Sequence, residues 1–172
     1  MIRRFTIVSL DHIRPGDPPL ALGVASIAAA LRSAGVKHEV ISVNVADGAP
    51  NFEDLTKRVI ETECTDVAIG AFVWNEPYTQ ELSRRLHPFM NVGLGGPQIT
   101  FHNSKAKKEP RLEDLYPYVH WSIRGPAEQP MIELGLGQIS QPTGIHFAGE
   151  NAQHFKILVA IQSELTVSSD AL

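Results

Sequence analysis

Residues 18–35, PPLALGVASIAAALRSAG, decide the fold that this sequence predicts. Apolar residues recur at helical spacing along the stretch and form one stripe, which consists of Leu20, Val24, Ile27, Leu31 and Ala34. Pro18 and Pro19 suit the first turn of a helix, and Gly35 suits its C-terminal cap. Because an apolar, β-rich run precedes this helix and another follows it, the chain opens with a strand, a helix and a second strand.

The same alternation continues along the chain. Apolar, β-rich runs predict five strands, at residues 5–10, 38–45, 66–73, 91–96 and 118–123. Helices are expected between them, with Asn51 and Asn75 as N-terminal caps, and a further helix is expected over 129–134. This order predicts an α/β fold of the doubly wound (flavodoxin-like or Rossmann-like) class, with a five-stranded parallel sheet.

The regular alternation ends near residue 136. Residues 1–136 are therefore expected to form one α/β domain, and residues 137–172 a short C-terminal extension punctuated by glycine and proline. A last β-like run, FKILVAI at 155–161, can add an edge strand to the sheet.

Composition narrows the classes of function. The 172 residues carry a formal net charge of −4 and are 43% hydrophobic, as in ordinary globular proteins. The basic cluster at 105–111 contains Glu109 and Pro110 and is expected to be a solvated loop, so no nucleic-acid partner is expected. The apolar run near the N-terminus is too short for a signal peptide, and no run reaches the length of a membrane span. We therefore expect a cytoplasmic protein with no membrane partner.

Small or polar residues follow three of the predicted strands. Asp11 and His12 follow the first strand, residues 70–75 end the third, and residues 95–99 end the fourth. The carboxyl ends of parallel strands share one edge of the sheet, where ligands of open α/β sheets bind. Glycines there predict a slot in which a flat or elongated ligand approaches the backbone closely, although tight turns alone would also explain them.

Other ligands of this fold class lack their motifs here. The loop SLDHIRPGDPP at 9–19 is not the Ser/Thr-rich phosphate loop of a flavodoxin, and Gly70 lies where a two-component receiver needs an aspartate. No G-x-G-x-x-G fingerprint follows the first strand, and no nucleophile elbow or H-E-x-x-H motif occurs. Simple versions of these sites are excluded.

Four stretches occur together in an order that is typical of one family. They are RPGDPPLALGVASIAAALRSAG at 14–35, VAIGAFVWN at 67–75, NVGLGGPQITF at 91–101 and YVHWSIRGPAEQPMIEL at 118–134. With these stretches, residues 1–136 resemble the N-terminal cobalamin-binding domain of B12-dependent radical SAM enzymes. In that family the pieces read as proline-leucine-glycine before a helix, an aromatic-x-Trp-Asn signature, a Gly-Gly-Pro turn and an Arg-Gly-Glu-x-Glu turn.

The resemblance implies a sheet order of 2-1-3-4-5 and a corrinoid cofactor, cobalamin in its base-off form. The corrin would lie over the strand ends, and the nucleotide tail would enter the slot near Gly70, Gly95 and Gly96. His12 is expected not to ligate the cobalt, so no metal ligand is assigned. The residues expected to contact the cofactor are Leu10, Asp11, His12, Gly70, Ala71, Phe72, Val73, Trp74, Asn75, Gly95, Gly96, Pro97, Gln98, Arg124, Gly125 and Glu128.

The sequence departs from the family at four points. Gly70 stands where the family often has a serine that binds the tail, and Gly125-Pro126 stands where it usually has Gly-Glu, with Glu128 kept. Cys64 is the single cysteine, so the C-x-x-x-C-x-x-C motif of a [4Fe–4S] cluster is missing. A radical SAM barrel is missing as well, and the chain is therefore expected not to be an enzyme on its own.

Three functions remain open. The first is a cobalamin-binding module that carries or presents the corrinoid to a separate radical SAM enzyme or methyltransferase. The second is an interaction or regulatory domain that keeps the fold without the ligand. Gly70 and Pro126 favour this function, because both depart from the family's pattern. The third is an enzyme that uses Asp11, His12 and Glu128 at the edge of the sheet, although their spacing matches no known chemistry.

Overall fold

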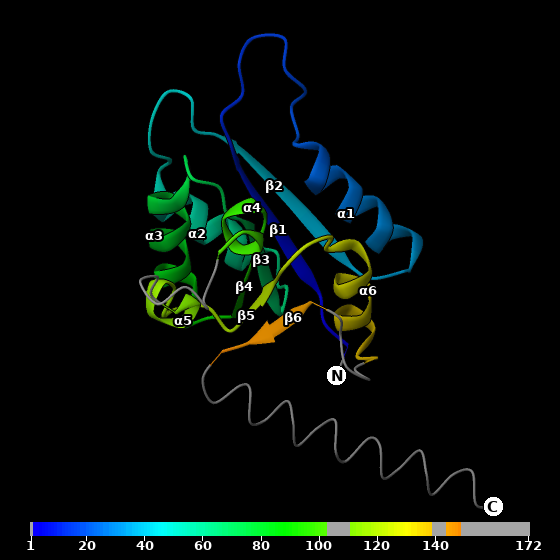
Figure 1. The fold of residues 1–172 in the computed structure, drawn as a ribbon. Helices are drawn as coiled ribbons and strands as arrows, with labels where there is room; N and C mark the ends of the chain where they lie inside the picture. Colours follow the sequence, from blue (N-terminus) through cyan, green and yellow to red (C-terminus); the bar gives the residue numbers. More distant parts are fainter. Residues whose placement is uncertain (1, 103–110, 139–143, 149–172) are drawn as a thin grey trace, which may run out of the picture.

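The computed structural model describes residues 2–102, 111–138 and 144–148, and these form one six-stranded sheet. Its strands are β1 (Phe5–Asp11), β2 (His38–Asn44), β3 (Asp66–Gly70), β4 (Asn91–Gly95), β5 (Trp121–Ile123) and β6 (Ile145–Phe147). They lie in the order β2-β1-β3-β4-β5-β6 (Figure 1). Strands β1 to β5 are parallel, which confirms the expected fold class and the order 2-1-3-4-5.

The sheet has one strand more than the five expected. Strand β6 pairs with β5 in antiparallel register, with Trp121 opposite Phe147 and Ile123 opposite Ile145. Three residues are too few to show a β pattern in the sequence, so this strand was not predicted. The run at 155–161, where an edge strand was expected, lies outside the described residues.

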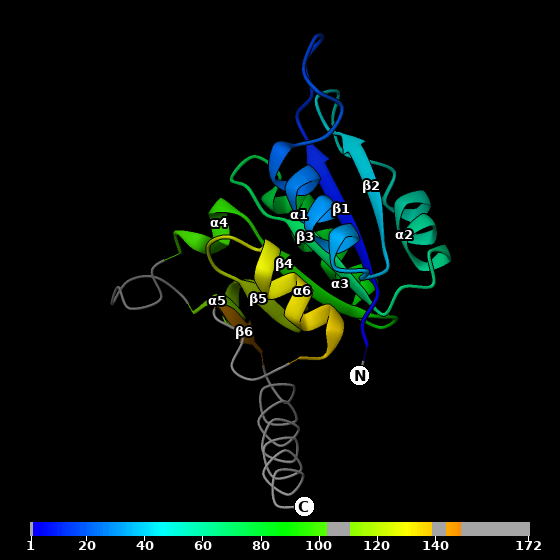
Figure 2. The ribbon, with the colours of Figure 1, turned by 90° about the vertical axis from the view of Figure 1, so that its right-hand side faces the viewer.

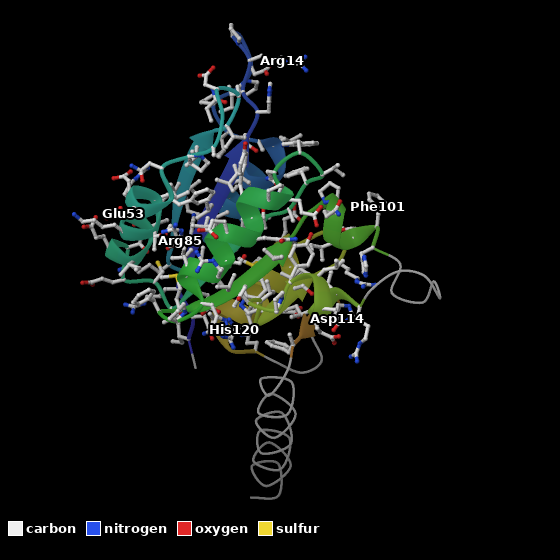
Figure 3. The ribbon with its side chains drawn as sticks, turned by 90° about the vertical axis from the view of Figure 1, so that its left-hand side faces the viewer. Arg14, Glu53, Arg85, Phe101, Asp114 and His120 are labelled. Atoms are coloured by element: carbon white, nitrogen blue, oxygen red, sulfur yellow. The ribbon has the colours of Figure 1, made fainter. Side chains whose placement is uncertain are left out.

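Helices cover both faces of the sheet. They are α1 (Leu22–Ser33), α2 (Phe52–Glu61), α3 (Glu76–Leu86), α4 (Pro97–Thr100), α5 (Leu112–Leu115) and α6 (Glu128–Leu136). Helices α1 and α6 pack side by side on one face (Figure 2). Helices α2 and α3 cover the other face, which Figure 3 shows with Glu53 on α2 and Arg85 on α3. Each face has its own cluster of buried apolar side chains. None of the helices in the described ranges combines the length and the apolarity that crossing a membrane requires.

The helix predicted over 18–35 is shorter than expected at its start. It begins at Leu22, so the placement of Pro18 and Pro19 in its first turn was wrong. Pro18 precedes another proline, which disfavours the helical conformation there. The carbonyl oxygen of Pro19 instead accepts a hydrogen bond from Ser42 Oγ on β2, at 3.0 Å. The other end is as predicted, because Gly35 has a φ of +71° just beyond the helix.

The two asparagines expected as caps behave differently. Asn51 accepts hydrogen bonds from the backbone N–H groups of Glu53 and Asp54, which confirms its role at the start of α2. Asn75 occupies the N-cap position of α3, but its side chain makes no capping bond. Its Oδ1 accepts from Phe72 N at 2.8 Å instead, so the capping prediction for Asn75 was wrong.

A buried carboxylate closes the amino-terminal end of the sheet on the α1/α6 face. Asp66, at the start of β3, is completely buried and accepts from Arg3 Nη1 at 2.7 Å and from Trp121 Nε1 at 3.0 Å. The Trp121 ring then lies over Gly93, where a Cβ atom would come within 2.2 Å of it. Arg3 also donates its backbone N–H to Gly135 O, at 3.0 Å. This end of the face is therefore filled and tied together.

Candidate functional site

A cavity of about 380 Å³ opens at the carboxyl ends of the strands, on the α1/α6 face. It lies between the first turns of α1 and α6 and the last residues of β3, β4 and β5. Its volume falls in the range of roughly 300–1,000 Å³ that small-molecule sites occupy. Seven of the residues predicted from the sequence line it, namely Gly70, Phe72, Gly95, Gly96, Pro97, Gly125 and Glu128.

Three glycines in the cavity wall are not required by the fold around them. Gly70 and Gly95 are neighbours across β3 and β4, and Gly23 lies in the first turn of α1. A Cβ atom would meet nothing closer than 3.4 Å at Gly70, nothing closer than 3.9 Å at Gly95, and nothing within 4 Å at Gly23. None of the three has a positive φ. The missing side chains therefore serve to leave the space open rather than to relieve a clash or a strained backbone.

Gly96 differs from these three because the turn requires a glycine. Its φ is +98°, and a Cβ atom there would lie 2.8 Å from the carbonyl oxygen of Ala71. The turn is tied to the end of β3 by hydrogen bonds from Ala71 N to Gly95 O at 2.8 Å and from Gln98 N to Ala71 O at 3.2 Å. Gly96 thus fixes the floor of the cavity in place.

One hydrogen bond joins the two helices at the cavity. Ser26 Oγ on α1 donates to Glu128 Oε1 on α6, at 2.7 Å. This bond, together with the backbone N–H groups of Glu128 and Ala127, lowers the pKa of Glu128. The carboxylate lies in the first turn of α6, where the helix dipole also favours a negative charge. Glu128 therefore remains ionised at neutral pH.

A second, smaller hollow of about 250 Å³ lies beside the cavity and contains Asp11, His12 and Trp74. Ala21 lines both hollows. The Phe72 ring of the cavity stacks on the Trp74 ring of the hollow, with centroids 4.5 Å apart. Apolar side chains are exposed around this edge, including Leu22 at 86%, Val73 at 76% and Trp74 at 56%. The edge thus offers a broad apolar surface next to the cavity.

Three of the predicted contact residues are buried in the protein itself. Leu10 and Ala71 belong to the apolar core under α2 and α3. Asn75 is completely buried, and its Nδ2 donates to Leu10 O at 3.1 Å and to Gly70 O at 2.9 Å. Asn75 therefore joins the ends of β1 and β3 and positions the loop that carries Phe72 and Trp74.

Two other predicted residues lie away from the cavity. Gln98 Nε2 donates to Glu76 Oε2 at 3.4 Å, and Tyr116 donates to Glu76 Oε1 at 3.1 Å. Burial and the neighbouring Glu76 raise the pKa of Tyr116, so its hydroxyl group stays protonated. Arg124 lines a different hollow of about 480 Å³, beside β5, β6 and α5. Neither Gln98 nor Arg124 lines the glycine-lined cavity.

The helical walls of the cavity were missed by sequence reasoning. They consist of Ala21, Gly23, Val24, Ile27, Ala127 and Met131, and Ser26 holds Glu128 beside them. Val24 and Ile27 had been assigned to the buried stripe of the helix. The small residues at 21, 23 and 25 are the signal that could have indicated a gap against the sheet.

Metal-ligating side chains do not gather at the cavity. Across residues 2–102, 111–138 and 144–148, no three His, Cys, Asp or Glu side chains come together as a set that could hold a metal ion. His12 is exposed at the edge of the sheet, and Cys64 is buried outside the cavity. What this arrangement can do is bind an apolar group between two helices and the strand ends.

Comparison with known proteins identifies relatives by fold only. No family model matches the sequence, and no curated protein matches it. A structure of the cobalamin-dependent S-adenosylmethionine radical enzyme OxsB, with aqua-cobalamin and S-adenosylmethionine bound, matches with a TM-score of 0.65 and 15% identity over 88% of this chain. The radical S-adenosylmethionine methyltransferase TsrM from Kitasatospora setae, with tryptophan and a SAM analogue bound, matches with a TM-score of 0.62 and 14% identity over 86% of this chain.

These matches concern only part of each enzyme. This chain spans 21% of the OxsB chain and 29% of the TsrM chain. At identities of 14–15% the likeness establishes a shared fold. The fold implied by the resemblance to B12-dependent radical SAM enzymes is thereby confirmed.

Proposed function

We propose that this chain is a corrinoid-binding module that takes cobalamin at the carboxyl edge of its sheet. The observation that carries the proposal is the cavity walled by Gly23, Gly70 and Gly95, where no neighbour explains the missing side chains. The fold shared with OxsB, a cobalamin-dependent enzyme, supports the same ligand. A corrinoid is far larger than 380 Å³, so only its nucleotide tail fits the cavity.

The cavity and the smaller hollow beside it suggest where each part of the ligand would lie. We propose that the tail enters between α1 and α6 over Gly70 and Gly95, and that the corrin lies over the exposed side chains of Val73 and Trp74. A lower base held in the cavity cannot reach the cobalt, so the cofactor would be bound in its base-off form. Asp11 and His12 would lie beside the corrin, and ligation of cobalt by His12 is not part of the proposal.

The bound corrinoid would supply cobalt-centred chemistry such as methyl transfer. This chain's own residues would bind and orient it, exclude water from the tail and leave one corrin face open to a partner. With one cysteine, the sequence lacks the motif for a radical SAM cluster. We therefore propose that the module is not catalytic alone and presents its corrinoid to a radical SAM enzyme or a methyltransferase.

Co-elution tests the proposal directly. Purified protein is mixed with hydroxocobalamin or methylcobalamin and desalted, and the corrin absorption band is expected to co-elute with the protein. Gly95→Val fills the cavity from a strand position that suits a β-branched residue, and is expected to abolish retention without unfolding the protein. Ala29→Leu adds similar bulk on the exposed side of α1 and serves as the matched control. Absence of the band from the unsubstituted protein contradicts the proposal.

A second candidate is a ligand-free docking domain, favoured by the exposed Leu22, Val73 and Trp74 at the edge of the sheet. Exposed apolar side chains of this kind also mark surfaces that bind other proteins. A rise in melting temperature on adding cobalamin would contradict this second function, because a ligand that prefers the folded state stabilises it. An unchanged melting temperature would favour it.

A further inference from the structure

The hollow of about 480 Å³ beside β5, β6 and α5, which we call the β6 hollow, has the size of a small-molecule site. Helix α5, marked by Asp114 in Figure 3, borders it. Leu94 and Trp121 border both this hollow and the glycine-lined cavity, because they belong to the sheet between the two. The β6 hollow plays no part in the corrinoid site proposed above.

The register of β5 and β6 brings three polar side chains of the β6 hollow to one face of the sheet. Trp121 and Ile123 pack on the α1/α6 face, so the alternation along the strand directs Ser122 and Arg124 to the opposite face. His146 lies directly opposite Ser122 across the antiparallel pair. Side chains in such a pair have Cβ atoms roughly 4.5–5.5 Å apart. Ser122, Arg124 and His146 can therefore contact one ligand.

Arg124 lacks the partner that a buried charged group normally has. Its Nε atom is buried without a hydrogen-bond partner, and within the described residues its guanidinium group forms no ion pair. A buried donor without an acceptor is costly, and more so when it is charged. The guanidinium group also keeps its charge at every physiological pH. Arg124 is therefore suited to bind an anion.

The other ionisable side chains of the β6 hollow leave the charge of Arg124 uncompensated. Arg111 Nη2 lies 2.8 Å from Glu113 Oε2, so these two charges offset each other. Burial, and then Arg124, lower the pKa of His146, so its ring is neutral at neutral pH. One positive charge therefore remains among the described residues that line the hollow. A carboxylate matches this charge, whereas a phosphate monoester would bring a second negative charge near Glu113.

We propose that the β6 hollow is a second binding site of this protein and takes a small organic carboxylate. Arg124 would donate two parallel N–H bonds to the carboxylate group, the geometry that a guanidinium group favours. The Ser122 hydroxyl group, which is 3% exposed as part of its residue, would donate a third bond. Leu112 and Val119 would contact the apolar part of the ligand. The inference does not depend on corrinoid binding.

NMR titration tests the site, with the backbone amide signals of Ser122, Arg124 and His146 as the readout. The probes are naphthaleneacetate and naphthaleneacetamide, which is similar in size but neutral. The carboxylate is expected to shift these signals with a dissociation constant of about 1 mM, as for other ligands of this size. The amide should bind about tenfold more weakly or worse, because it loses the charged bond. Equal binding of both probes, or no shift with the carboxylate at about 10 mM, overturns the proposal.

Naphthyl phosphate tests the choice of carboxylate. It has the same apolar part with a doubly charged group, and it should bind more weakly than naphthaleneacetate because of Glu113. Tighter binding of the phosphate overturns the assignment to a carboxylate.

Two arginine variants test which charge binds the ligand. Arg124→Gln should weaken naphthaleneacetate about tenfold or more and leave naphthaleneacetamide unchanged. Its melting temperature should not fall, because the guanidinium group has no partner in the folded protein. Arg111→Gln is the matched control, since it removes the same charge from the same hollow but from an arginine that Glu113 already pairs. Equal losses in the two variants, or a large fall in the melting temperature of Arg124→Gln, overturn the proposal.

Competition with cobalamin separates this site from the proposed function. Cobalamin should leave naphthaleneacetate bound, because the two ligands occupy opposite faces of the sheet. Displacement would assign the β6 hollow to the corrinoid and overturn the second site, while the proposed function stands. Carboxylate binding by a protein that does not retain cobalamin would support the second site and contradict the proposed function alone.

Discussion

Gly93 and Gly95 lie two residues apart on β4 and face the same pair of helices, but only Gly93 has a neighbour above it. A Cβ atom at Gly93 would come within 2.2 Å of the Trp121 ring, whereas one at Gly95 would come no closer than 3.9 Å to any atom. The closed end of this face is held by Asp66, and the open end is the cavity. The same residue type thus makes room for the protein's own side chain at one end and borders an open cavity at the other.

The closed end should give the largest change in stability. Asp66→Ala removes the acceptor of Arg3 and of Trp121 Nε1, which leaves the Trp121 donor unpaired in the interior and the partly exposed Arg3 without its partner. The free energy of unfolding should fall by about 3 kcal/mol, because an unsatisfied buried donor costs about 1–3 kcal/mol and the lost charge-assisted bond adds to it. Urea unfolding measures the change. The exposed pair of Asp54 with Arg58 is the control, and Asp54→Ala should cost less than about 1 kcal/mol.

The two glycines provide the sharpest comparison. Gly93→Ala forces the Trp121 ring out of its place and should lower the free energy of unfolding by about 1–3 kcal/mol, as overpacking does. Gly95→Ala should leave it unchanged or raise it by up to about 1 kcal/mol, because glycine weakens a strand. Urea unfolding measures both changes. Equal losses of unfolding free energy in the two variants would show that the space above Gly95 is filled.

The contact at the cavity mouth should matter less for stability. Ser26→Ala removes the hydrogen bond to Glu128, which is at the surface, and should lower the free energy of unfolding by less than about 1 kcal/mol. It should also raise the pKa of Glu128 toward its ordinary value, since this bond is the largest cause of the lowered pKa. NMR titration of the Glu128 carboxyl group would show the shift. An unchanged pKa would mean that Ser26 does not hold the carboxylate.

The smallest effect is a dependence on pH at the closed end. Burial, and then the nearby His87, lower the pKa of His120, whose Nδ1 accepts from Val92 N at 2.9 Å. The unfolded chain takes up this proton near pH 6.5, before the folded protein does. Stability is therefore full above about pH 6.5 and falls as the pH decreases toward the lower, folded pKa. Burial, and then Arg124, also lower the pKa of His146, which adds to the same trend.

Unfolding measured between pH 5 and pH 8 should show this slope, and His120→Asn should reduce it. The asparagine keeps an acceptor for Val92 N but does not titrate, so the remaining slope should come from His146. Glu128 contributes only at lower pH, because its carboxylate loses its stabilising effect as the pH falls below about 4.5. An unaltered slope in His120→Asn would mean that another group causes the pH dependence of stability.

Sequence reasoning reached the parallel sheet because the apolar runs are local and repeat along the chain. It also placed Gly70 and Gly95 correctly at one edge, since parallel strands end on the same side. It could not give the direction of Gln98 and Arg124, whose side chains leave the cavity for other surfaces. Nor could it predict that Gly23 lines the cavity and that Ser26 binds Glu128. The apolar stripe of a helix shows which side is buried, but not which turn lies beside a cavity.

The role of Asn75 shows the same limit. As an isolated asparagine before a helix it indicates a cap, yet its amide is used by β1 and β3, which are distant in the chain. The short strand β6 depends entirely on pairing with β5 and leaves no pattern of its own. In both cases tertiary contacts outweigh the local preference.

The amide of Asn75 also bears on how the loop at the cavity responds to a ligand. Since Phe72 N–H is held by a buried acceptor, this loop amide should resist hydrogen–deuterium exchange as well as a strand amide does. The aromatic pair of Phe72 and Trp74 is then pre-organised before any ligand arrives. Binding of a ligand would therefore cost little conformational entropy in the loop that carries Phe72 and Trp74. A protein with such a rigid apolar edge can bind and release a ligand without refolding.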